Sequence, residues 1–214
     1  MITLGIDTSE REGGVALYSE GGISEEVLFE GPLRHAESLF PAIDRLLKRA
    51  GLDKGEIELV SVNQGPGSFT GLRIGLAGAK GLCQGLHIPL VGVDGTLSYR
   101  SRLPDAERVC VIITSRRDLV YVRWFAGERA KGATRLLHEE ELIGMLSKEG
   151  REMTLVGSGA PRVYARVKEN RALRIAPERL NRPSPLAIAR LGAGDGRLDR
   201  LFQLEPTYVE SILA

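Results

Sequence analysis

Two short polar stretches carry the residue types best suited to chemistry in this chain, and each follows a strand-like apolar run. The first follows residues 2–6, and the second lies in a glycine-rich loop after residues 59–64. Together they supply Asp7, Thr8, Ser9, Gly67, Ser68 and Thr70. A loop between a strand and a helix can bind an anion through the helix N–H groups. We expect these six residues to be candidate contacts for a nucleotide or another anion, unless both stretches are turns that serve packing and capping.

The glycine loop departs from the standard nucleotide-binding motifs. Gly65, Gly67 and Gly71 are spaced one residue too widely for the dinucleotide pattern. The run Gly78-Ala79-Lys80-Gly81 lacks the Gly-Lys-Ser/Thr of a P-loop. Pro66 also removes one N–H donor from the loop. A tight turn that serves packing therefore remains the alternative to an anion site.

No other arrangement of residues indicates a catalytic centre. His35, His87 and His138 have no second ligand at the spacing that places two metal ligands on one helix face. Ser68 does not lie in the G-x-S-x-G turn of a serine hydrolase. We therefore expect no catalytic residue, no metal and no cofactor.

The loop opens a helix of unusual composition within Gly65–Gly85. Five glycines lie inside it or at its edges, at positions 71, 75, 78, 81 and 85. Interior glycine costs about 1 kcal/mol per site, so the helix carries a penalty of roughly 4 kcal/mol that tertiary packing must offset. The glycines share one face, and the combined bare and apolar arc is wider than one core contact needs. We expect close packing on two sides, one being the chain's own sheet and the other a second chain; the alternative is that both are intramolecular.

The elements around these stretches predict an α/β fold. In the first half, three strand-like runs at residues 2–7, 15–18 and 23–30 precede a helix at 36–50, a strand at 59–64, a helix at 70–86 and a strand at 89–93. Strands joined by tight turns and then by helices predict a mixed sheet. The second half repeats this loosely, with strands near 109–113, 120–125 and 153–156 and helices near 139–148 and 184–191. Pro41 fits its helix only if that helix begins near Ser38; otherwise the helix kinks there. We place two domains at residues 1–100 and 101–214.

Composition and charge bear on possible ligands and on the location of the protein. The formal net charge is +1, which gives no global case for binding nucleic acid or a membrane. No apolar run is long enough to span a bilayer, and the N-terminus has no signal-peptide pattern. Cys83 and Cys110 lie in apolar surroundings, which favours buried thiols and a cytoplasmic location. The segment 161–182 is rich in arginine and can guide an RNA backbone; the alternative is a solvated face with its charges balanced elsewhere.

Several longer runs resemble one protein family. The run GPGSFTGLRIG at 65–75, continuing as AGAKGL at 77–82, is similar to the signature of the TsaB (YeaZ) proteins. Supporting runs are LGIDTS at 4–9, GVAL at 14–17, HAESLFPAIDRLL at 35–47, IPLVGV at 88–93 and the late Pro206-Thr207-Tyr208. Thr114 stands where the family usually has an aspartate, and Glu210 stands near the place of a usual arginine.

The resemblance implies a two-lobed fold of the actin, Hsp70 and sugar-kinase group (ASKHA, RNase H-like), each lobe a mixed sheet with helices. It implies a non-catalytic subunit in the synthesis of threonylcarbamoyladenosine in tRNA, which stabilises a TsaD-like catalytic subunit. A TsaE-like ATPase and tRNA would join the complex, and the chain alone would form a homodimer.

The resemblance also implies where partners bind, namely through the first two helices. The implied interface residues are Leu39, Ile43, Leu46, Leu72, Gly75, Leu76, Gly78, Ala79 and Leu82. The alternative function is that of an independent phosphotransferase or peptidase of the same fold group. A phosphotransferase would bind ATP at Asp7-Thr8-Ser9 and at the loop Gly157-Ser158-Gly159-Ala160.

Overall fold

A computed structural model describes residues 1–30, 35–194 and 203–209 of the chain. The chain divides into two compact units, Met1–Ser98 with Pro183–Thr207, and Tyr99–Arg182 with Tyr208–Ala214. The sequence prediction assigned all residues after 100 to the second domain. The first unit instead includes a late segment, because the last described helix packs on its sheet.

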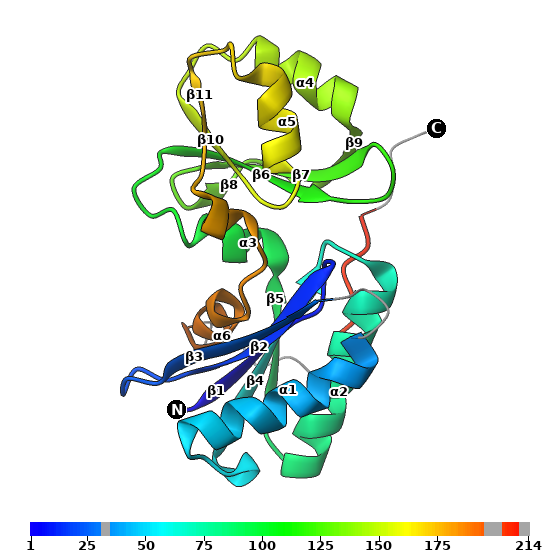
Figure 1. The fold of residues 1–214 in the computed structure, drawn as a ribbon, viewed down its shortest axis with the longest axis vertical. Helices are drawn as coiled ribbons and strands as arrows, with labels where there is room; N and C mark the ends of the chain where they lie inside the picture. The colour runs from blue at the N-terminus through cyan, green and yellow to red at the C-terminus, as the bar shows by residue number, and fades with distance from the viewer. Residues whose placement is uncertain (31–34, 195–202, 210–214) are drawn as a thin grey trace. The chain divides into compact units, whose positions relative to one another are not determined.

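The first unit is built on a five-stranded mixed sheet (Figure 1) in the order β3-β2-β1-β4-β5. The bounds in this order are Ser24–Glu30, Glu12–Tyr18, Thr3–Asp7, Leu59–Gly65 and Leu90–Asp94. β1 is antiparallel to β2 and parallel to β4, which is parallel to β5. The carboxyl ends of β1, β4 and β5 therefore meet at one edge of the sheet, and both candidate stretches lie there.

Helices cover both faces of this sheet. α1 (His35–Ala50) and α2 (Phe69–Leu86) share a core with alternate residues of β1, Leu4 and Ile6. Gly5 between them faces α6 (Pro185–Gly194), since an added Cβ would meet the backbone N of Ala189 at 2.8 Å. Successive strand residues point to opposite faces, so α6 lies on the face away from α1 and α2.

The second unit holds a six-stranded sheet in the order β11-β10-β6-β7-β8, with β9 also paired to β7. The bounds are Leu173–Ile175, Met153–Val156, Arg108–Thr114, Leu119–Ala126 and Arg129–Ala130, with β9 at Arg135–His138. α4 (Glu139–Ser147) and α5 (Ala160–Val167) pack on it through one apolar cluster. Three short elements complete the described structure. η1 (Lys54–Glu56) belongs to the first unit and η2 (Glu178–Asn181) to the second, while α3 (Gly95–Arg100) begins in the first unit and ends in the second.

Most of the predicted elements are present, and the predicted fold class is confirmed. The order of strands and helices up to β5 is as predicted. Of the two alternatives for Pro41, a helix start near Ser38 is not observed, because α1 already includes His35 and Pro41 therefore lies inside the helix. The prediction also missed α5 and β11 inside the arginine-rich segment.

The burial of the two cysteines agrees with the expectation from the sequence. Cys83 and Cys110 are free, buried thiols, as predicted. Burial raises the pKa of Cys83 to about 12, and burial also raises the pKa of Cys110. Within the described ranges, no helix is both long and apolar enough to cross a membrane.

Candidate functional site

The carboxylate of Asp7, at the end of β1, is buried and accepts hydrogen bonds from its neighbours. Its Oδ1 accepts from the Ser9 backbone N–H at 3.0 Å and from the Ser9 hydroxyl at 2.7 Å. The same oxygen accepts from Asn63 Nδ2 of β4 at 3.0 Å. Asp7 is only 1% exposed. The parallel pairing of β1 with β4 brings the two strand ends together and so creates this contact.

Asn63 joins this cluster to the glycine loop. Its Nδ2 also donates to the Ser9 hydroxyl oxygen at 2.9 Å, and its Oδ1 accepts from the Gly65 N–H at 2.8 Å. Gly95 packs against the same amide, because an added Cβ would lie 2.7 Å from its terminal atoms. Sequence reasoning read Asn63 only as a strand residue. The available signal was an amide at the end of a strand, opposite an aspartate at the end of another.

The N-terminus of α2 is bound directly to the turn after β1. The Ser68 N–H donates to the Ser9 carbonyl at 2.7 Å, and the Ser68 hydroxyl caps the helix by accepting from the Gly71 N–H at 3.3 Å. The Thr8 hydroxyl donates to the Gly71 carbonyl at 2.7 Å. A side chain at Gly71 would collide with the Thr8 carbonyl. The glycine is needed here because the helix and the turn touch through their backbones.

The structure therefore brings the predicted stretches 7–9 and 67–70 together, and this contact buries the polar groups of the first stretch. Thr8 and Ser9 are each 2% exposed, whereas Ser68 and Thr70 are exposed. The polar groups of one stretch satisfy those of the other, as well as that of Asn63. Such an arrangement stabilises the junction of β1, β4 and α2, because the buried carboxylate has hydrogen-bond donors around it. Among the residues the structure describes, no group of three or more His, Cys, Asp or Glu side chains is placed to hold a metal ion.

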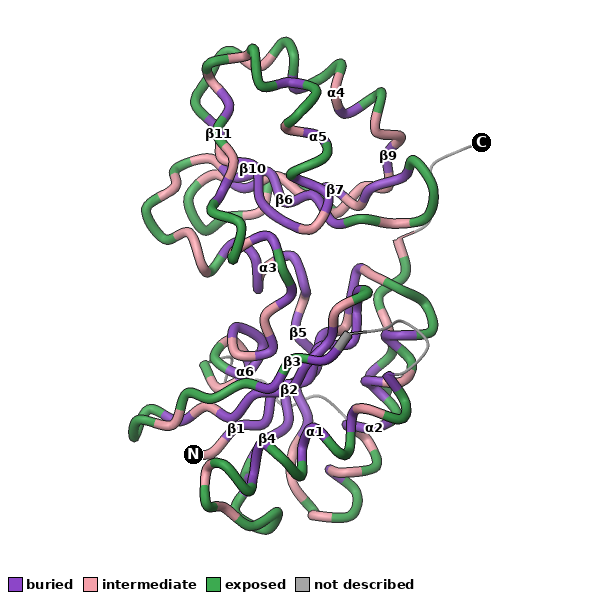
Figure 2. Tube along the Cα trace, in the orientation of Figure 1, coloured by how far each residue is buried: buried purple, intermediate pink, exposed green. Residues whose placement is uncertain are grey.

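The residues predicted for a partner interface lie mainly in the core of the first unit. Eight of them are buried within the chain and Leu82 is partly buried: Leu39, Ile43, Leu46, Leu72, Gly75, Leu76, Gly78 and Ala79 form the buried group. Gly75 packs against the side chain of Thr8, and Gly78 against Leu39 of α1. The small size of these residues is thus explained by contacts inside one chain. Figure 2 shows α1 and α2 with buried segments (purple) alternating with exposed ones (green).

The glycines of α2 differ by their position along the helix. Gly71, Gly75 and Gly78 are buried, whereas Gly81 and Gly85 are exposed, and an added Cβ at either would meet nothing within 4 Å. The exposed surface of α1 and α2 also carries Phe40, Phe69 and Ala77. Phe40 and Phe69 are 48% and 52% exposed. The Phe40 ring reaches to 3.8 Å from the Cβ position of Gly78, which places it over α2.

Three arginines of the arginine-rich segment form ion pairs with glutamates of the same unit. Arg166 donates to both carboxylate oxygens of Glu140, at 2.9 and 3.3 Å, and Arg162 pairs with Glu139. Arg174 pairs with Glu152 at 2.6 Å. These arginines therefore join α4 to α5 and β10 to β11. This favours the interpretation of a face with balanced charges over one that guides RNA.

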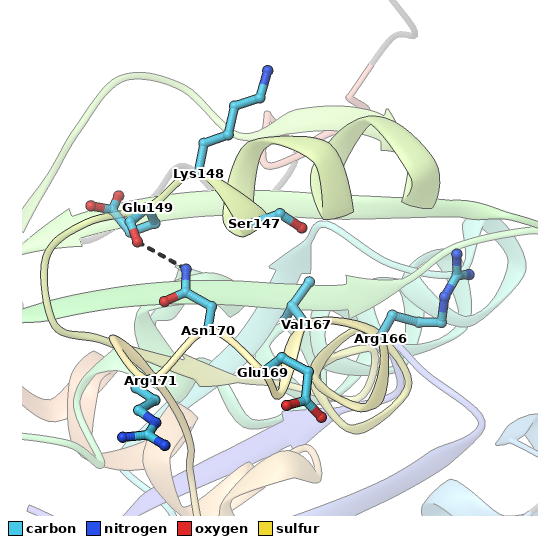
Figure 3. Close-up of a pocket in the computed structure, with 8 residues that line it drawn as sticks. All are labelled: Ser147, Lys148, Glu149, Arg166, Val167, Glu169, Asn170 and Arg171. Atoms are coloured by element: carbon cyan, nitrogen blue, oxygen red, sulfur yellow. Dashed lines mark hydrogen bonds between the residues drawn. The ribbon is translucent and has the colours of Figure 1, made fainter.

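A pocket of about 450 Å³ lies where α4 and α5 end (Figure 3). It is lined by Ser147, Lys148, Glu149, Arg166, Val167, Glu169, Asn170 and Arg171. Asn170 Nδ2 donates to the carbonyls of Leu146 and Glu149, at 2.9 and 2.8 Å, so it satisfies one carbonyl in the last turn of α4 and one just after the helix. The hydrogen bonds from Arg108 hold the pKa of Glu149 at about 2, against the opposing effect of burial. The central polar groups of the pocket thus serve the structure of the second unit.

The sequence of this chain is similar to those of proteins that modify tRNA. The family model of TsaD, tRNA N6-adenosine threonylcarbamoyltransferase, matches residues 21–179. The Escherichia coli (strain K12) tRNA threonylcarbamoyladenosine biosynthesis protein TsaB is 32% identical over 153 residues, 70% of this chain and 64% of that protein. A Nitratidesulfovibrio vulgaris tRNA N6-adenosine threonylcarbamoyltransferase is 38% identical over 109 residues, 44% of this chain and 30% of that protein. The chain thus spans less than two thirds of these relatives.

Solved structures extend the likeness to nearly the whole chain. YeaZ from Pseudomonas aeruginosa superposes with a TM-score of 0.80 at 27% identity, covering 97% of this chain and 99% of that one. The ROK hexokinase from Thermus thermophilus, with a TM-score of 0.53 at 14% identity over 92% of this chain and all of that one, shares the fold. The chain therefore belongs to the TsaB (YeaZ) family, whose two-lobed fold is that of the actin-like sugar kinases.

Proposed function

We propose that this chain is a non-catalytic subunit of the machinery that makes threonylcarbamoyladenosine in tRNA. The observation that carries the proposal is the state of the strand-end carboxylate. Asp7 is buried, and its Oδ1 is taken by three donors from Ser9 and Asn63. A carboxylate committed in this way helps to hold the fold instead of contacting a phosphate or a metal-bound water. The printed names of the TsaB relatives supply the pathway.

The partner in this proposal is a TsaD-like catalytic subunit, bound by the outward face of α1 and α2. We define this face by its exposed residues Phe40, Phe69, Ala77, Gly81 and Gly85. Phe40 exposes apolar surface that a partner would remove from water, whereas the exposed ring of Phe69 already has the Arg73 guanidinium over it at 3.7 Å. Ala77, Gly81 and Gly85 lie four residues apart and let a partner helix approach the α2 backbone closely. The chain alone would use the same face to form a homodimer, and the TsaE-like ATPase and tRNA would join the larger complex.

Light scattering coupled to size exclusion tests the partner face. Gly81→Leu places a bulky side chain where the free chain has open space, so the monomer should fold while association weakens at least about tenfold. Gly144→Leu is the matched control. Gly144 is also an exposed helical glycine with open space around it, but it lies on α4 of the second unit. Equal association of the two variants, alone and with a TsaD-like partner, would refute this face as the contact.

The alternative function makes a different prediction about the same chain. An independent phosphotransferase needs ATP at the strand ends, so Asp7→Asn should abolish turnover or ATP binding measured by calorimetry. On the present proposal the purified chain shows no ATP turnover, and Asp7→Asn changes stability alone, because Asp7 acts within the fold. ATP turnover that is lost in Asp7→Asn at unchanged stability would replace the subunit proposal by the enzymatic one.

A further inference from the structure

A short late segment of the chain lies against the ends of β4 and β5. We call residues 203–207, which belong to the first unit, the C-terminal strap (red in Figure 1). The Thr207 N–H donates to the Gln64 carbonyl at 2.7 Å, and Gln64 Nε2 donates to the Glu205 carbonyl at 2.8 Å. Gln64 thus holds the strap by its backbone and its side chain together. Both hydrogen bonds involve main-chain groups of the strap, as in the binding of an added strand to the edge of a sheet.

One side chain of the strap is anchored in the core. Leu204 is 6% exposed and belongs to the apolar cluster shared by α1, α2 and the sheet. The side chains of Glu205 and Thr207 are exposed. The contacts therefore define a simple recognition pattern. It consists of one apolar anchor, a carbonyl one residue later, and an N–H three residues after the anchor.

Two glycines leave the surface bare where the strap crosses it. At Gly92 of β5, an added Cβ would lie 2.6 Å from both the Leu204 methyl carbon and Gln64 Oε1. At Gly65 of β4, an added Cβ would lie 2.7 Å from the Thr207 carbonyl oxygen. Gly65 also has a φ of +120°, a conformation that favours glycine. The sheet is thus shaped to receive an extended backbone at this place.

We propose that Gln64, Gly65 and Gly92 form a peptide-binding groove whose resident ligand is the chain's own C-terminal strap. Because recognition needs only one apolar side chain and two main-chain groups, an extended peptide with the same pattern can displace the strap in trans. The groove is separate from the outward face of α1 and α2, so the inference does not rest on the proposed function. It assigns to this chain a second binding site, for an extended segment with a leucine anchor.

Competition with a labelled peptide tests the groove in the full-length chain. The probe is a fluorescent peptide with the sequence of residues 203–209, Gln-Leu-Glu-Pro-Thr-Tyr-Val. Leu204→Ala removes the anchor of the resident strap, so the probe should bind this variant about tenfold or more tightly than the unchanged chain. A probe with alanine in place of its leucine should lose a similar factor. Equal binding of both probes, or equal binding to both proteins, would overturn the proposal.

Hydrogen exchange supplies a readout that survives if Leu204→Ala fails to fold. Gln64→Ala keeps the anchor and removes only the side-chain hydrogen bond to Glu205. The Thr207 amide should then exchange about tenfold faster, while amides of the central strand β1 keep their rates. If Thr207 keeps its rate, or if β1 and Thr207 accelerate together, the strap is an inseparable part of the core and the proposal fails.

Discussion

Replacing Asn63 tests whether the strand-end cluster holds the first unit together. Asn63→Ala removes hydrogen bonds to Asp7 Oδ1 at 3.0 Å and to the Ser9 hydroxyl at 2.9 Å, and it leaves the Gly65 N–H without its 2.8 Å acceptor. A hydrogen bond to a charged group is worth about 1.5–3 kcal/mol, and a buried unsatisfied N–H costs about 1–3 kcal/mol. Because Asn63 is only 4% exposed, water does not replace these partners. We expect the free energy of unfolding to fall by about 3–5 kcal/mol.

Asn63→Asp gives the same test a pH dependence. It keeps the shape of the side chain and places a second buried carboxylate beside Asp7. Like charges raise the pKa of one member of such a pair in the folded state. The folded chain then binds more protons than the unfolded chain near neutral pH, so the stability of the variant should rise as the pH falls toward 5. Below the unfolded pKa of about 4 the gain is complete.

Urea unfolding at pH 7 and pH 5 measures both variants. Asn170→Ala is the control, because Asn170 also makes three hydrogen bonds, but it is less buried and contacts no carboxylate. Its cost should be near 1 kcal/mol and independent of pH over this range. If Asn63→Ala costs no more than this control, or if Asn63→Asp is as stable as the unchanged chain at pH 7, the reasoning about the cluster is refuted.

Three further outcomes follow from contacts in the two units. Gly78→Leu should lower the melting temperature of the single chain, because the new side chain must displace Leu39 at a cost of about 1–3 kcal/mol. An unchanged melting temperature would instead support Gly78 as part of a partner interface. Arg108→Met should remove a contribution of about 1 kcal/mol that is present above the unfolded pKa of a glutamate, near 4.3, and is lost as the pH falls toward the folded value of about 2 for Glu149. Urea midpoints for this variant and the unchanged chain should therefore converge between pH 4 and pH 2, and a constant gap would contradict the pairing. The thiols of Cys83 and Cys110 should resist an aromatic disulfide reagent at pH 8 until urea unfolds the chain, and rapid labelling of the native protein would show that they are accessible.

Sequence patterns correctly placed the two polar stretches at the ends of strands, because strand ends are local features. Asp7 and Ser68 each follow an apolar run, and parallel pairing of those runs brings them to one edge. The role of Asn63 was not predictable in the same way. Its side chain acts through two other segments, and the pattern of β4 reveals only that it ends a strand. The helix α5 was missed although Ala160, Val163 and Val167 have helical spacing, because the surrounding arginines were read as a charged patch.

The partner surface shows a second limit of sequence reasoning. A bare and apolar helix face predicts close approach, but it does not say whether the neighbour is another chain or the same one. In α2 the described contacts are all with the same chain, and they involve only some of the glycines. Gly75 and Gly78 meet β1 and α1, whereas Gly81 and Gly85 face open space. The contacts of α2 with β1, with the turn after β1 and with α1 distinguish the buried glycines from the open ones.

The discontinuity of the first unit has a consequence for the order in which the chain is made. Its sheet is complete once residue 94 has been synthesised, but one face stays uncovered until α6 follows from Pro185 onward. At typical rates of synthesis this interval lasts roughly 5–20 s. The second unit is almost wholly contained in the intervening Tyr99–Arg182. On the ribosome, the later unit can therefore bury its core first, and the earlier unit finishes last, which leaves its nascent sheet in need of protection by chaperones in the meantime.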